Sequence, residues 1–134
     1  MSTTPTPSAR ALVFWVIWFA ILSGLLMMQF MLGGGIPTGN NAPGASLPPI
    51  AFIALGEVLA STAVRWLVLP RFTAFPRKLA WMLVGIALSE GAGFFEIFLV
   101  PRNQPETRQF VLALAVFGIV QFAPIYATSS DDGR

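Results

Sequence analysis

The sequence predicts an all-α integral membrane protein, a four-helix bundle whose four transmembrane helices run up and down. Hydrophobic residues make up 55% of its 134 residues and charged residues only 10%, whereas a typical soluble domain is about 25% charged. The apolar residues also gather in four runs, each close to the roughly 20 residues that a helix needs to cross about 30 Å of hydrocarbon. A soluble domain of this size has too little interior to hide so many apolar side chains.

The first half of the chain contains two of the predicted membrane helices. A short tail, residues 1–10, precedes an uncharged apolar run at 11–32, which we expect to cross the membrane as an uncleaved anchor. Residues 33–49 are rich in Gly, Pro and Asn and cannot continue a helix, so we expect an outer loop there. The second membrane helix is expected at 50–69, and Pro70 ends it.

The second half repeats this alternation of apolar runs and short polar loops. A basic loop at 70–78 leads into the third predicted membrane helix, 79–100, and a loop at 101–108 leads into the fourth, 109–127. Residues 128–134 form the remaining tail. Because loops this short join neighbouring elements, consecutive helices should be antiparallel.

The distribution of basic residues predicts the orientation of the bundle. The end that carries both termini receives Arg10, Arg71, Arg77, Lys78 and Arg134, whereas the other end receives Arg102 and Arg108. The positive-inside rule therefore places both termini in the cytoplasm and the Gly/Pro-rich loop outside. We expect a multi-pass protein of the cell (inner) membrane whose surroundings are the lipid bilayer. Because the bases are spread along the chain, we expect no nucleic-acid partner.

Two residue types are missing, and their absence limits the possible chemistry. The chain contains no His and no Cys. This excludes Ser-His triads, His-ligated haem, zinc or copper, thiolate nucleophiles and iron-sulfur clusters. We therefore expect no catalytic residues, no cofactor and no metal, and a protein that is not an enzyme.

Charges inside the predicted helices are the candidate functional residues, because a charged group at mid-bilayer costs from about 2.5 to more than 10 kcal/mol. Arg65 lies toward the cytoplasmic end, where its long side chain can reach the interface. Glu96 lies toward the outer end, where interfacial solvation or pairing with Arg102 or Arg108 accounts for it. Depth alone thus makes Arg65 and Glu96 secondary candidates.

Glu57 and Glu90 lie too deep for such explanations. Helix geometry places them about 4 Å and about 1 Å outside the midplane, so they are nearly level. Ser61 follows Glu57 by one helical turn and Ser89 directly precedes Glu90, so either hydroxyl can hydrogen-bond a buried carboxyl. If the two carboxyls are close, they cannot both ionise in a low dielectric. Glu57, Glu90, Ser61 and Ser89 therefore form the main candidate site.

Three interpretations of this carboxyl pair remain open. It is a structural clasp between helices, a site that exchanges a proton or cation, or a site for a ligand such as a lipid or quinone headgroup. Small residues also recur at a spacing of four, which allows helices to approach closely within the chain or between subunits. These residues are Ala20 and Gly24; Gly56 and Ala60; and Gly85, Ser89 and Gly93.

Two short stretches resemble known membrane families. IALSEGAGFFEIFLV, residues 86–100, resembles the carboxylate-bearing helix of rotary ATP synthase c-ring subunits, and ALGEVLAST, residues 54–62, is similar to the first helix of small multidrug resistance transporters around its essential Glu. Each resemblance implies that a mid-helix Glu exchanges an ion. Each covers only about one helix, and we assign the chain to neither family.

The sequence thus favours a small non-catalytic membrane subunit or scaffold in which Glu57 and Glu90 clasp the second and third helices. The alternative is a proton- or cation-coupled transporter of a small solute, with Glu57 and Glu90 as the exchange site. Four helices are few for a transport pathway, so that function requires an oligomer. In either case we expect partners in the membrane, either further copies of the chain or other subunits.

Overall fold

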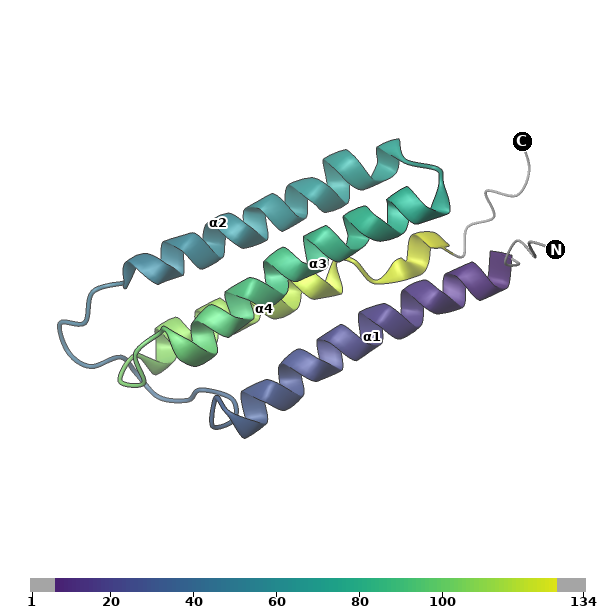
Figure 1. The fold of residues 1–134 in the computed structure, drawn as a ribbon. Coiled ribbons are helices and arrows are strands. Elements are labelled where there is room, and N and C mark those ends of the chain that lie inside the picture. Colours follow the sequence, from purple (N-terminus) through teal and green to yellow (C-terminus); the bar gives the residue numbers. More distant parts are fainter. Residues whose placement is uncertain (1–6, 128–134) are drawn as a thin grey trace.

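The computed structural model describes residues 7–127, and this part of the chain is all-helical, with no β-strand. It contains four α-helices: α1 (Pro7–Met31), α2 (Pro49–Ala63), α3 (Phe75–Phe98) and α4 (Pro105–Val120). They run along one common direction, with α1 and α2 on opposite sides of α3 and α4 (Figure 1). Residues 1–6 of the predicted first tail and the whole predicted tail at 128–134 lie outside the described residues.

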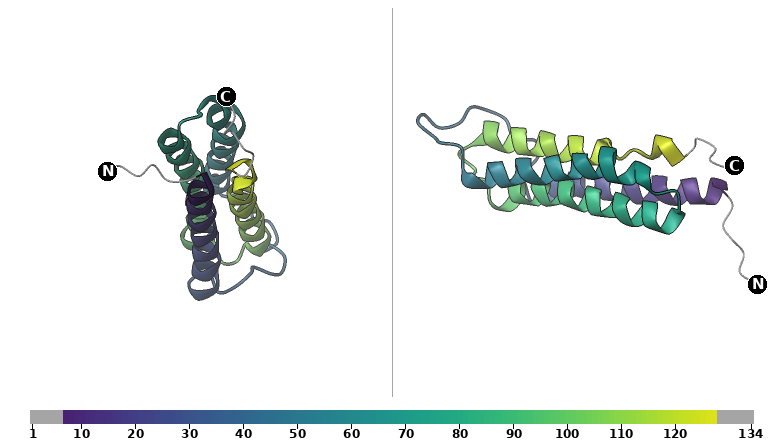
Figure 2. Two further views of the ribbon diagram at one scale, coloured as in Figure 1. Left: turned by 90° about the vertical axis from the view of Figure 1, so that its right-hand side faces the viewer. Right: turned by 90° about the horizontal axis from the view of Figure 1, so that it is seen from above.

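The connections make consecutive helices antiparallel, in the up-down order expected from the short loops. The start of α1 and the end of the described chain therefore lie at the same end of the bundle, and the long loop after α1 lies at the opposite end (Figures 1 and 2). Near the middle of α1, the indole Nε1 of Trp18 donates a hydrogen bond of 2.8 Å to the carbonyl oxygen of Ile119, close to the end of α4.

A proline lies at the first or second position of all four helices, and α1 begins at Pro7. α2, α3 and α4 each have a Pro at the first or second helical position. Proline suits this position because the first-turn N–H groups have no helical acceptor and because its φ angle is already helical. As a result, α3 begins at Phe75 and α4 at Pro105, where the sequence predicted starts at 79 and 109.

The second helical segment changes its winding before it ends. α2 continues into a π-helical turn, η1 (Val64–Val68), and a 3-10 turn, η2 (Leu69–Arg71). Pro70 explains the change, because it has no N–H to donate to the preceding turn and its ring crowds that turn. The whole segment Pro49–Arg71 nevertheless remains long and apolar enough to cross a membrane.

The fourth segment is shorter than predicted. α4 ends at Val120, and a short 3-10 helix, η3 (Pro124–Ala127), follows a turn. Pro124 disfavours the helical conformation of the residue before it, so the α-helix stops short of the predicted end at 127. Three helical segments are long and apolar enough to span a membrane, namely Ser8–Met31, Pro49–Arg71 and Phe75–Phe98. α4 has 16 residues, fewer than the about 20 of a typical span.

The outside of the bundle is apolar, and its interior contains polar groups. Phe19, Phe52 and Phe117 expose 65%, 61% and 58% of their surface, whereas Gln29 and Glu96 are almost completely buried. The interior also contains an apolar core to which all four α-helices contribute. Its members include Phe14, Leu25, Ala54, Val58, Met82, Ile86, Val111, Ala115 and Ile119.

Small residues allow α2, α3 and α4 to meet closely. Ser61 Oγ donates to the carbonyl oxygen of Gly85, and Ser89 Oγ donates to Ser61 Oγ, both at 2.7 Å. Gly118 of α4 lies against Ser89, since a Cβ atom added to it would come within 2.7 Å of Ser89 Cβ. A Cβ atom on Gly85 would overlap the ring of Phe122. The spacing of the helices thus depends on the absence of side chains at Gly85 and Gly118.

Replacing Gly118 with Ala should therefore lower the free energy of unfolding by about 1–3 kcal/mol, because the added methyl group overpacks the contact with Ser89. Thermal unfolding of the detergent-solubilised protein measures this change. Gly56→Ala is the matched control, since a Cβ atom there meets nothing within 4 Å. Equal losses of stability in the two variants would contradict the close approach of α3 and α4.

Candidate functional site

Glu57 projects from α2 toward α3. Its side chain is only partly exposed, and a Cβ atom added to Gly91 of α3 would lie 3.0 Å from its Oε2 atom. That Oε2 atom is buried and has no hydrogen-bond partner among the described residues. Since Gly91 has no side chain, the carboxyl group of Glu57 rests directly on the backbone of α3.

Glu90 lies at a similar depth but on another side of α3. Measured from the middle of their helical segments, Glu57 and Glu90 are both displaced by about 5 Å toward the end that carries the long loop. Adjacent helical residues point about 100° apart, so Glu90 does not share the direction of Gly91. It lies one turn before Gly93, whose added Cβ atom would come within 2.6 Å of Leu25 Cδ1 in α1. Glu90 is partly exposed and points away from the direction of Gly91, whereas Glu57 approaches α3 from α2 at Gly91.

No hydrogen bond or ion pair within residues 7–127 joins the two carboxyl groups to each other or to another side chain. From their positions in the sequence, Ser61 and Ser89 are expected to hydrogen-bond these carboxyls. The structure instead brings the two hydroxyls together with the carbonyl group of Gly85. The polar contact that joins α2 to α3 is therefore made by the serines, and the carboxyls of Glu57 and Glu90 take no part in it.

A second acidic site lies nearer the end with the long loop. Arg108 Nε is 2.7 Å from Glu96 Oε1, and their side chains are 9% and 0% exposed. Arg108 Nη2 also donates a hydrogen bond of 3.0 Å to the carbonyl oxygen of Gly33. The ion pair therefore joins α3, α4 and the loop that follows α1. Interfacial solvation and pairing with an arginine were the two explanations expected for Glu96. The structure shows pairing, with Arg108 as the partner, and the pair lies inside the bundle.

Gln29 completes this buried polar cluster. Its side chain lies beside the Glu96 carboxyl group, and its Nε2 atom donates a hydrogen bond of 2.7 Å to the carbonyl oxygen of Gly35. Gly33 permits the arrangement, since a Cβ atom on it would lie within 2.7 Å of the Gln29 amide group. Neither the place of Gln29 in this cluster nor the burial of Arg108 is predicted from the sequence. The available signal was that Gln29 is the only amide side chain in the first apolar run.

Arg65 is held at the opposite end of the bundle. Its Nε atom donates a hydrogen bond of 2.7 Å to the carbonyl oxygen of Gln121, where α4 has ended, and its guanidinium lies 4.8 Å from the ring centre of Trp66. The Gln121 side chain in turn donates to Thr62 Oγ1 at 3.1 Å. From its depth, the Arg65 side chain was expected only to extend to the membrane interface. In the structure it is also held against the end of α4.

The residues described do not form a metal site, since no three acidic side chains among them gather closely enough to hold an ion. Comparison of the chain with models of protein families, with curated proteins and with solved structures found no match. The function must therefore be inferred from the geometry of this chain.

Breaking the Glu96–Arg108 ion pair should destabilise the bundle strongly. Glu96→Gln or Arg108→Gln alone leaves one buried charge without its partner, and we expect each to lower the free energy of unfolding by about 3–5 kcal/mol. The double variant removes both charges and should lose clearly less than the sum of the two single losses. Denaturant unfolding in detergent micelles measures these values.

Glu106→Gln serves as the control, because Glu106 is exposed at the same end of the bundle. It should change stability by less than about 0.5 kcal/mol. Additive losses in the double variant would show that Glu96 and Arg108 do not depend on each other.

Proposed function

We propose that the chain is a small non-catalytic subunit or scaffold of the cell membrane, which assembles with a second copy or another membrane subunit through the carboxyl groups of Glu57 and Glu90. The observation that carries this proposal is the buried Oε2 atom of Glu57, which has no hydrogen-bond partner among residues 7–127. A polar group at mid-bilayer depth must find a partner, because hydrocarbon supplies none.

The distribution of side chains supports embedding in a membrane. Large apolar side chains cover the outside of the helices, while the ion pair and the bonded serines lie within. This arrangement suits a hydrocarbon solvent, in which apolar surface carries no penalty and polar groups must be satisfied inside the protein. Three helical segments also have the required length and hydropathy.

The charges at the two ends of the bundle support a cytoplasmic location of both termini. Among the described residues, the end near the start of α1 is basic and has no acidic residue, whereas the other end mixes both signs. The first group is Arg10, Arg65, Arg71, Arg77 and Lys78, and the second is Glu96, Arg102, Glu106 and Arg108. By the positive-inside rule, the first end faces the cytoplasm.

The surroundings of Glu57 are suited to a partner helix. Gly56 and Ala60 beside it on α2 are small and exposed, and Gly91 facing it on α3 has no side chain. Ser61 and Ser89 join α2 to α3 without Glu57, and the side chain of Glu57 is partly exposed, so its carboxyl group can be reached by a helix from outside. A protonated carboxyl both donates and accepts a hydrogen bond, so it can pair with a second carboxyl or with backbone carbonyl groups of that helix.

Proton- or cation-coupled transport of a small solute by an oligomer is the second candidate function. The same unpartnered carboxyls favour it, since a group that binds and releases an ion must not be locked in an internal ion pair. Glu57 and Glu90 would then be the exchange site. The two functions differ in whether the carboxyl group must titrate or only form a hydrogen bond.

Substitution at Glu57 separates these functions. If the carboxyl holds subunits together, Glu57→Leu should weaken self-association about 3- to 20-fold, the effect of losing an interhelical hydrogen bond of about 0.6–1.7 kcal/mol. Glu57→Gln keeps a donor and an acceptor and should retain most of the association. Because the chain has no Cys, disulfide cross-linking through a single Ala60→Cys substitution in membranes reports on association at this face.

Phe19→Cys on α1 is the control position, and it should cross-link equally in all variants. Unchanged cross-linking in Glu57→Leu, together with loss of substrate-induced proton release in Glu57→Gln, would reject the scaffold and support transport. If the chain assembles only with other subunits, Glu57→Leu should weaken the cross-links from Ala60→Cys to those subunits in the same way.

Reporters fused to the termini test the proposed topology. We expect a fluorescent protein that matures only in the cytoplasm to be bright at both termini, because four crossings return the chain to its starting side. A phosphatase that is active only outside should be inactive at both. An external C terminus would mean that α4 does not cross, and the shortness of α4 makes this test informative.

A further inference from the structure

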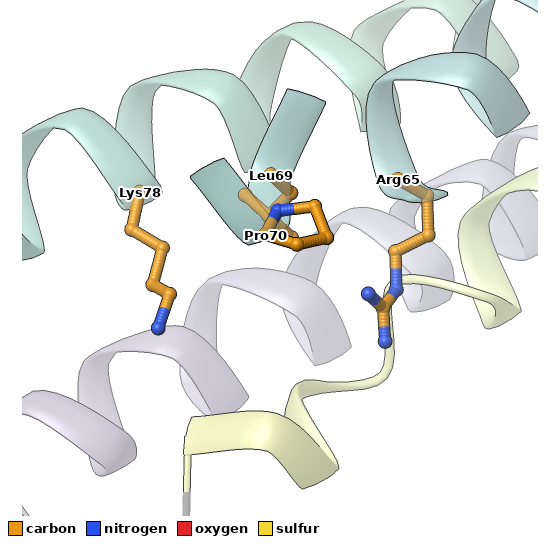
Figure 3. A pocket seen from close by; sticks show the side chains of 4 residues that line it. All are labelled: Arg65, Leu69, Pro70 and Lys78. Atoms are coloured by element: carbon orange, nitrogen blue, oxygen red, sulfur yellow. The ribbon is translucent and has the colours of Figure 1, made fainter. Parts of the chain in front are cut away.

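We infer that a pocket at the basic end of the bundle binds the phosphate group of an anionic phospholipid. The pocket encloses about 120 Å³ and is lined by Arg65, Leu69, Pro70 and Lys78 (Figure 3). The inference rests on the membrane embedding proposed above, but it requires neither self-association nor a particular role for Glu57 and Glu90.

Two cations from different helical segments border the pocket. Arg65 belongs to the π-helical turn η1, and Lys78 belongs to the first turn of α3. Figure 3 shows both side chains reaching toward the same side, with Leu69 and Pro70 between them. A group bound between the two cations would therefore rest on an apolar floor, and Pro70 offers it no N–H group.

The guanidinium of Arg65 is oriented before any ligand binds. One edge of it is used by the hydrogen bond from Nε to the carbonyl oxygen of Gln121, and one of its faces by the ring of Trp66. Such restraint reduces the side-chain entropy that binding would otherwise remove. A planar guanidinium matches two phosphate oxygens, and the lysine ammonium adds a second positive charge.

The remaining charges at this end strengthen the attraction for an anion. Arg71 and Arg77 are exposed nearby, and Arg10 lies over the ring of Phe75 at 5.8 Å. None of the acidic residues in the described part of the chain lies at this end. By the proposed orientation, these basic residues face the leaflet in which anionic lipids produce a negative surface potential.

The apolar surroundings favour a lipid over a soluble phosphate. Trp66 and Leu67, which adjoin Arg65 in the chain, expose 61% and 62% of their surface. An acyl chain attached to the bound phosphate can cover such side chains, and an aromatic ring next to a cation is suited to the headgroup layer. A soluble phosphate would gain the ionic contacts alone.

Lipid binding to the full-length protein in detergent tests this inference. Native mass spectrometry and the rise in thermal midpoint are measured with phosphatidylglycerol, phosphatidylcholine and inorganic phosphate. We expect phosphatidylglycerol to bind at least tenfold more tightly than phosphatidylcholine, and inorganic phosphate to bind much more weakly than phosphatidylglycerol. Lys78→Gln should weaken phosphatidylglycerol binding at least fivefold.

Arg77→Gln and Arg71→Gln are matched controls, because each removes one positive charge at the same end without touching the pocket. They should change binding less than twofold. Arg65→Lys keeps the charge but removes the planar guanidinium, and its binding should also fall if it remains folded by thermal unfolding without lipid.

Three results would overturn the inference. Equal binding of phosphatidylglycerol and phosphatidylcholine would exclude recognition of an anionic headgroup. If Arg77→Gln weakened lipid binding as much as Lys78→Gln, the binding would depend on the overall positive charge of this end and not on a specific pocket. Equally tight binding of inorganic phosphate would assign the pocket to a soluble phosphate. Repeating the titration with Glu57→Leu separates this inference from the proposed assembly, since lipid binding should persist in that variant.

Discussion

The ion pair between Glu96 and Arg108 is the interaction on which the arrangement of the helices depends. Two charges inside the bundle are tolerable only together, because a single buried charge has no compensating partner. Their pairing sets α4 against α3, and the further bonds from Arg108 to Gly33 and from Gln29 to Gly35 bring the loop after α1 to the same place. One polar cluster thus determines the relative positions of three helices.

The opposite end of the bundle follows from where α4 stops. Pro124 interrupts the helix, so backbone carbonyl groups near Val120 lose their usual helical donors. Trp18 donates to Ile119 and Arg65 donates to Gln121, which joins α1 and the turn after α2 to the end of α4. The same bond orients Arg65 beside the pocket that it shares with Lys78. The end of α4 at Val120 therefore helps to shape the pocket, whose lining residues come from the segment after α2 and from α3.

The carboxyls of Glu57 and Glu90 contrast with this internal pairing. Glu96 has an arginine inside the bundle, but Glu57 and Glu90 lie on separate sides of α3 and have no polar partner in the described chain. An apolar solvent makes such groups expensive, so their presence favours an external function. The proposed assembly contact and the proposed lipid pocket lie at different depths along the bundle.

The sequence by itself predicted an all-helical chain with apolar segments long enough to cross a membrane, because the length and hydropathy of each apolar run require no knowledge of its neighbours. It also indicated the depth of each charge, since depth depends only on position along a helix. Only the tertiary structure decided which way each side chain points and what it meets. For that reason Ser61 was found with Ser89 and not with Glu57, and Gln29 beside Glu96 was missed. Contacts between helices depend on their rotation about their axes, which spacing along one chain segment does not specify.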